Sequence, residues 1–139
     1  MSGIIINPYS FATGSAFSST KSLDFDGVDA RVAFTEVVYS DAFTFSFWVK
    51  PSSLTLAFLA GDINSVTSLI WLISTTTIML KAGVGNYTFT ESGGNDITIG
   101  AWQNIIITRD GSDNVKAFRN GTAFGGTSTV SGNFEFNSI

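Results

Sequence analysis

The stretch that decides the fold is Phe43-Thr44-Phe45-Ser46-Phe47-Trp48-Val49-Lys50-Pro51. A period of two places alternate side chains on opposite faces of a β-strand, so the odd-numbered apolar positions share one face. The even-numbered positions, from Thr44 to Lys50, occupy the other face. Pro51 ends the strand, because proline has no N–H for the next rung of the ladder. These residues therefore predict a core strand with three aromatic rings in register.

A second strand is expected at residues 102–109. Ile105 and Ile107 share one face, while Trp102, Asn104 and Ile106 lie on the other. We expect both of its faces to be at least half buried.

The rest of the chain has the same β character, and no window shows the apolar spacing of an amphipathic helix. Tight turns at residues 110–113 and at Asn120-Gly121 predict a meander of three consecutive strands. The pattern is typical of an antiparallel β-sandwich. Strands are expected at residues 22–25, 31–34, 42–50, 56–61, 68–74, 77–82, 86–90, 101–109, 115–120, 122–129 and 133–136.

Composition excludes several classes of function. The 139 residues fit one domain and carry 7 Lys and Arg against 11 Asp and Glu, a net charge of −4, which argues against a nucleic-acid partner. With no Cys and no His, the chain lacks disulfides, thiolate zinc sites and the commonest general base. Only 13% of the residues are charged, which indicates either assembly with neighbours or a Ser/Thr-rich soluble surface.

The ends of the chain carry no targeting signal that the sequence reveals. No apolar run approaches the roughly 20 residues of a membrane-spanning helix, so membrane insertion is not expected. The N-terminus lacks the basic region and long apolar core of a signal peptide. We interpret residues 1–20 as an extended N-terminal arm and residues 21–139 as the folded domain.

Four segments in order resemble a known family. They are residues 23–32 (LDFDGVDARV), 43–51 (FTFSFWVKP), 102–111 (WQNIIITRDG) and 118–121 (FRNG), and they are similar to the successive motifs of concanavalin A-like, laminin G-like domains. The resemblance covers about residues 22–133. It departs at Gln103, where the family often has His, and at Arg31, near which a second acidic residue is common.

The resemblance implies a jelly-roll sandwich of two antiparallel sheets, with carbohydrate or protein ligands bound at loops or at the concave sheet, and it does not imply an enzyme. Family members continue into a closing strand, so the last strands are expected to be missing here, through truncation or because a neighbouring chain supplies one. Enzymes of this fold use an E-x-D-x-E strand, whereas Glu36, Glu91 and Glu135 are isolated along this chain. We therefore predict no enzymatic activity and no catalytic residues.

The opening run IIINPYSFA also resembles the start of certain tailed-phage structural proteins. This resemblance implies a virion surface component, either a head decoration or part of a tail fibre, made in the host cytoplasm. Assembly with copies of itself or with other virion proteins is expected to use the arm and the terminal strand. The residues concerned are Ile4, Ile5, Ile6, Tyr9, Phe11, Phe134 and Phe136. The alternatives are a carbohydrate-binding lectin module for host recognition and a fragment of a larger secreted adhesin.

Two further sites are candidates. Asp26 and Asp29, with Asp62 from a second loop, could hold Ca²⁺ through hard oxygen ligands, although the same aspartates suit tight turns. No other cofactor is expected. Exposed aromatic rings could stack on the apolar faces of sugars, and the residues proposed for a glycan are Tyr87, Asn86 and Trp48. Tryptophans at strand period are more often core residues, so Tyr87 is the aromatic that we expect to be exposed.

Overall fold

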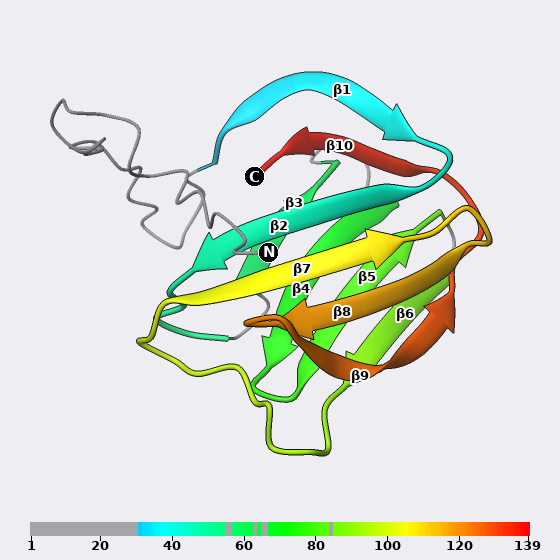
Figure 1. The fold of residues 1–139 in the computed structure, drawn as a ribbon. Coiled ribbons are helices and arrows are strands. Elements are labelled where there is room, and N and C mark those ends of the chain that lie inside the picture. The colour runs from blue at the N-terminus through cyan, green and yellow to red at the C-terminus, as the bar shows by residue number, and fades with distance from the viewer. Residues whose placement is uncertain (1–30, 55–56, 63, 65–66, 84) are drawn as a thin grey trace, which may run out of the picture. The chain divides into compact units, whose positions relative to one another are not determined.

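The computed structural model describes residues 31–54, 57–62, 64, 67–83 and 85–139, which fold into two antiparallel sheets (Figure 1). None of these residues is helical. The six-stranded sheet has the order β1-β10-β3-β4-β5-β6 and the four-stranded sheet the order β2-β7-β8-β9. The strands are β1 (Ala33–Tyr39), β2 (Phe43–Val49), β3 (Ala57–Gly61), β4 (Ser68–Ser74), β5 (Thr77–Ala82), β6 (Gly85–Thr90), β7 (Gln103–Arg109), β8 (Asn114–Arg119), β9 (Thr122–Thr129) and β10 (Phe134–Ser138).

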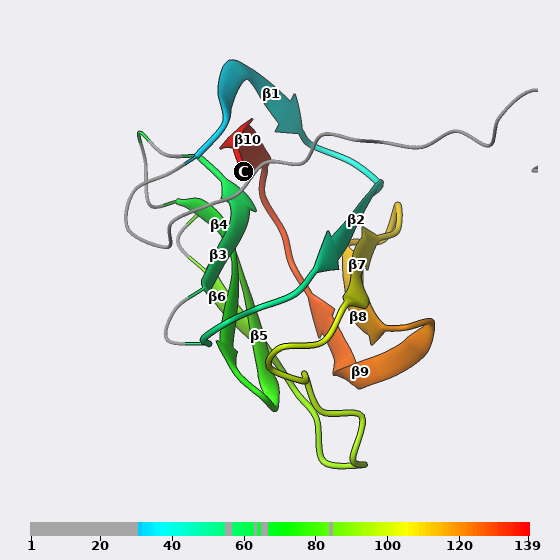
Figure 2. The ribbon, with the colours of Figure 1, turned by 90° about the vertical axis from the view of Figure 1, so that its left-hand side faces the viewer.

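The two sheets stack to form a sandwich, which confirms the all-β prediction (Figure 2). The alternation of β2 is as expected, since Phe43 is buried while Thr44, Ser46 and Trp48 are exposed. Phe89, Phe124 and Phe134 are among the largest fully buried side chains between the layers. Burying each ring contributes roughly 1.5–3 kcal/mol, so the aromatic core is a major source of stability.

The described strands differ from the expected ones mainly at β1. The sequence predicted a strand at residues 31–34, whereas β1 runs from Ala33 to Tyr39 and pairs with β10. Nearly all of β1 is exposed, on both faces, so it lacks the alternation by which a half-buried strand is recognised. The expected strand at residues 22–25 and the arm at residues 1–20 lie outside the described residues.

The terminal strand β10 lies between β1 and β3, with antiparallel pairing on both sides. The expected open edge at this strand is therefore not found among the described residues. Phe134 is fully buried, and Phe136 packs against Phe34 and Phe45 with ring centroids 4.9 and 5.1 Å apart. The hypothesis that both rings contact a neighbouring chain does not agree with this intramolecular packing. The other residues proposed for assembly, Ile4, Ile5, Ile6, Tyr9 and Phe11, lie outside the described residues.

A buried arginine ties the two sheets together at one end. Arg109, only 3% exposed, donates hydrogen bonds to the carbonyl oxygens of Asp41, at 2.7 and 2.9 Å, and of Gly132, at 2.6 Å. Its guanidinium lies 5.0 Å from the centre of the Phe43 ring. These contacts satisfy a buried cation and anchor the β1–β2 and β9–β10 connections, two of those that cross between the sheets.

At the opposite side, β9 comes against β6 of the other sheet. Gly125 has a φ of +67°, and a Cβ atom there would lie 2.8 Å from the backbone nitrogen of Thr90. Only glycine permits this approach, because any side chain would overlap the neighbouring backbone. The contact brings the two sheets together at β6 and β9.

Candidate ligand-binding face

Two tryptophans stand on the outward side of the four-stranded sheet. Trp48 is 69% exposed and Trp102 is 66% exposed. Trp48 pairs with Asn104 across β2 and β7, and Trp102 lies two residues before Asn104, so the two indoles are diagonal neighbours on one face. The expectation that strand tryptophans lie in the core is wrong for both. We call the outward side around Trp48, Trp102, Asn104, Ile106 and Phe118 the tryptophan face.

Polar groups in this face are held by a chain of hydrogen bonds. The Asn104 Nδ2 donates to Ser46 Oγ at 3.0 Å and to the Phe47 carbonyl oxygen at 3.1 Å. The Asn104 backbone N–H donates to Asn120 Oδ1 at 2.8 Å. Asn120 and Gly121 have φ values of 49° and 80°, which agrees with the predicted tight turn. The amide beside Trp48 is therefore fixed in orientation.

The segment before β7, residues 91–102, is pinned to the sheet by Gln103 and Arg119. The buried Gln103 accepts a hydrogen bond from the Thr98 N–H at 3.1 Å and donates to the Thr98 carbonyl oxygen at 2.9 Å. Arg119 donates to Gln103 Oε1 at 2.6 Å and to Asn95 Oδ1 at 3.2 Å. This segment carries Trp102, so the network positions that indole beside β2.

Glu91 holds the beginning of the same segment. Its carboxylate accepts hydrogen bonds from the backbone N–H groups of Gly93 and Gly125. These hydrogen bonds lower the pKa of Glu91 from its ordinary value of 4.5, and the bond from Gly93 has the larger effect. The carboxylate thus links the segment to β9 at the closed side of the sandwich.

The three residues proposed for a glycan do not form one site. Tyr87 pairs with the buried Leu80, packs against the core and is half-buried, with its ring lying over Gly85. Asn86 is exposed on the other side of β6, opposite Lys81. Trp48 belongs to the other sheet. The prediction that Tyr87 is the exposed aromatic is therefore wrong, whereas Trp48 is as open as a stacking role needs.

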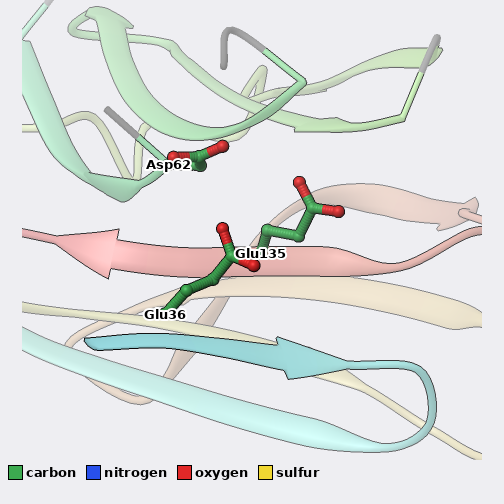
Figure 3. A group of neighbouring side chains, drawn as sticks. All are labelled: Glu36, Asp62 and Glu135. Atoms are coloured by element: carbon green, nitrogen blue, oxygen red, sulfur yellow. The ribbon is translucent and has the colours of Figure 1, made fainter. Parts of the chain in front are cut away.

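Three carboxylates from different elements come together on the six-stranded sheet. Glu36 of β1, Asp62 after β3 and Glu135 of β10 each have a carboxylate oxygen within 4.8 Å of the others (Figure 3). The glutamates are isolated in the sequence, but the pairing of β1 with β10 brings them together. Asp62 is buried and accepts hydrogen bonds from the Asn64 N–H and the Asn137 amide.

This donor set fits a hard cation, because Ca²⁺ takes several carboxylate and carbonyl oxygens. Of the residues predicted to bind calcium, Asp62 is the one that lies here. Asp26 and Asp29 lie outside the described residues, so calcium binding stays a prediction.

The described residues contain no helix with the length and apolarity that a membrane crossing requires.

The chain is similar in fold to several proteins of known structure. Nine chains of solved structures match the fold. One of them comes from a study showing that cell entry of botulinum neurotoxin type C depends on interaction with two ganglioside molecules. It is 19% identical in sequence to this chain, with a TM-score of 0.45. That match covers 78% of this chain but only 34% of the other, so the chain spans about a third of its length. No curated protein sequence matches.

A family model gives the clearest relationship. Residues 26–138 match a laminin G-like model that is described as the concanavalin A-like lectin/glucanases superfamily. The matched range contains every described strand, including β10. The comparisons give no support for the resemblance to tailed-phage structural proteins, which stays a prediction. The chain belongs to the concanavalin A-like lectin/glucanases superfamily.

Proposed function

We propose that the chain is a non-enzymatic carbohydrate-binding module and that its tryptophan face contacts the sugar. The observation that carries this proposal is the pair of exposed indoles, Trp48 and Trp102, on one side of one sheet. Indole surface left in water is unfavourable, and the flat apolar face of a pyranose covers it well. The amides and hydroxyls between the indoles supply the hydrogen-bonding groups that a sugar needs.

The rigidity of the face supports the same function. Asn104 is fixed by Asn120 and Ser46, and the segment leading to Trp102 is fixed by Gln103 and Arg119. A surface that is ordered before binding loses less conformational entropy when the ligand arrives. The fixed positions of these side chains therefore support a ligand-binding surface more than a strand surface that is only in contact with water.

The absence of catalysis is part of the proposal. Hydrolysis of a glycosidic bond uses two carboxyl groups that flank the bound sugar. The strands β2, β7, β8 and β9 contain no Asp or Glu. The close carboxylates of Glu36, Asp62 and Glu135 belong to the six-stranded sheet and so do not border the tryptophan face.

The test is an oligosaccharide array followed by calorimetric titration of the ligands that bind. Trp48→Ala and Trp102→Ala are each expected to weaken binding at least about tenfold. Trp71→Ala, which changes a half-buried tryptophan of the other sheet, is the matched control and should leave affinity unchanged. Equal loss in all three variants, or no binding by the wild-type chain, contradicts the proposal.

Assembly with other protein chains is a second candidate, favoured by the exposure of β1. Val37 and Val38 are 43% and 48% exposed, on opposite faces of a strand that ends the described six-stranded sheet. Exposed apolar edge strands tend to pair with other chains. A virion surface component or a larger adhesin would use such a contact. Sedimentation should show an oligomer that Val38→Lys dissociates, and a monomeric wild-type chain contradicts this candidate.

A further inference from the structure

A hollow adjoins the tryptophan face between β8 and β9. The pairing of these strands shifts register between Lys116 and Ala117, where β9 carries Gly125 and Gly126. A Cβ atom added at Gly126 would meet no atom within 4 Å, so the space above it is open. The resulting cavity of about 270 Å³ is bordered by Lys116, Phe118 and Thr127. It is large enough to admit a substituent of a sugar ring.

Lys116 brings a positive charge to this hollow, although the chain carries a net charge of −4. The Glu91 carboxylate lies beside Gly125 at the border, where it accepts hydrogen bonds from the Gly93 and Gly125 N–H groups. No Asp or Glu occurs in β2, β7, β8 or β9, while Lys116 lies in β8 and Lys50 directly follows β2. Among the described residues no carboxylate lies within ion-pair distance of Lys116. Asp110, in the adjacent turn, feels the charge of Lys116, but its carboxylate accepts hydrogen bonds from Ser112 and Asn114. Lys116 is thus available to an anionic ligand.

The hollow and the indoles lie on the same outward side. Trp48 is two residues from Ser46, which pairs with Ile106, and Ile106 pairs with Phe118 at the border of the hollow. Lys116 pairs with Thr108, four residues along β7 from the Asn104 that pairs with Trp48. With strands about 4.8 Å apart and a rise of about 3.4 Å per residue, Trp48 and Lys116 are separated by roughly 17 Å. This span is longer than a single sugar ring. A ligand that touches both places must be a chain of several rings.

We infer that the ligand is an acidic oligosaccharide, with one ring stacked on Trp48 and the carboxylate of another ring bound by Lys116 in the hollow. This inference rests on the proposed function and narrows it to a class of ligand. A carboxylate bound by an ammonium forms a charge-assisted hydrogen bond, which is about twice as strong as a neutral one. A neutral chain would leave Lys116 without that contact.

The experiment compares acidic oligosaccharides with their own methyl esters. Oligogalacturonate, oligomannuronate and oligoguluronate of five rings are each titrated calorimetrically, as free acids and as fully esterified chains. Esterification removes the charge and keeps the rings and linkages. At least one free acid is expected to bind about tenfold more tightly than its ester, and added salt should weaken only the acid.

Lys116→Gln is expected to remove most of this preference for the free acid. Lys81→Gln, on β5 of the other sheet, removes the same charge and is the matched control. Equal effects of the two variants would mean that only net charge matters, and that result overturns the inference. Equal binding of an oligothymidylate would indicate a general polyanion surface and would also overturn it.

Different results would overturn the acidic ligand and carbohydrate binding as such. Equal affinity for an acid and its ester, with binding still lost in Trp48→Ala, overturns the acidic ligand and leaves carbohydrate binding standing. No binding by any oligosaccharide, acidic or neutral, overturns both. Thermal unfolding of each variant shows that it is folded before its binding is interpreted.

Discussion

Arg119 donates a hydrogen bond from its Nε to the buried Oε1 of Gln103, across 2.6 Å, and thereby fixes the segment that carries Trp102. The same guanidinium reaches Asn95 and Thr98 through its other two nitrogens. Gln103 is one of the positions at which the chain departs from the laminin G-like motifs that it resembles. In this chain its amide both donates to and accepts from the Thr98 backbone, a combination that needs no change of protonation.

Arg119→Met is therefore expected to weaken oligosaccharide binding and to lower the free energy of unfolding by about 1–3 kcal/mol, since it leaves the buried Gln103 oxygen with one partner fewer. Chemical denaturation and calorimetric titration measure the two effects. Arg31→Met removes the same charge from an exposed position and should change neither. Unaltered binding in Arg119→Met would contradict the positioning role.

Gly125→Ala should destabilise the sandwich by at least about 2 kcal/mol, because its φ is positive and a methyl group would overlap the Thr90 backbone. Gly126→Ala, at the next position, meets open space and should change stability by less than about 0.5 kcal/mol. Urea unfolding of both variants gives the comparison. Similar stabilities would show that β9 does not approach β6 as described.

Acid should weaken the fold partly through Glu91. Its pKa is lowered in the folded state by the Gly93 and Gly125 N–H groups, so the folded chain holds the ionised form more strongly than the unfolded chain does. The resulting stabilisation is present above the ordinary pKa of 4.5 and is lost as the pH falls through the lower folded value. Glu91→Gln should be less stable than the wild type at pH 7, and the difference should vanish in strong acid. A difference independent of pH would contradict this.

Calcium is expected to raise the unfolding temperature at millimolar concentration, because binding to the folded chain alone stabilises it by mass action. Glu36→Gln should reduce the shift, since Glu36 lies within 4.8 Å of Asp62 and Glu135. Asp26→Asn tests whether the residues first predicted as ligands contribute. The absence of both binding heat in a calorimetric titration and a change in unfolding temperature at millimolar calcium would rule the site out.

The sequence predicted most strands because runs of β-forming residues lie between turn residues, and some of these runs also alternate in burial. The expected bounds of β4, β5 and β9 match the observed ones, and β2 differs by one residue at each end. β1 was missed in large part because Val37 and Val38 are both exposed, which removes the period on which such predictions depend. Its place in the sheet depends on β10, about 100 residues away in the chain, and no local pattern reports that pairing.

The candidate site was only partly predictable. Trp48 lies on the same strand face as Thr44, Ser46 and Lys50, because all four positions are even-numbered. The polar character of that face predicts that Trp48 is exposed. Tyr87 stands among polar residues in the sequence but shares parity with the buried Phe89, and it turns inward. The meeting of Glu36, Asp62 and Glu135 could not be foreseen, since it follows from strand order alone.

The most direct test of the tryptophan face is backbone amide chemical-shift mapping of the isotopically labelled chain during titration with an oligosaccharide. The largest shifts are expected at Trp48, Trp102, Asn104 and Ile106, together with the two indole N–H signals. Shifts concentrated instead on β4, β5 and β6, or no shifts with any oligosaccharide, would contradict the account.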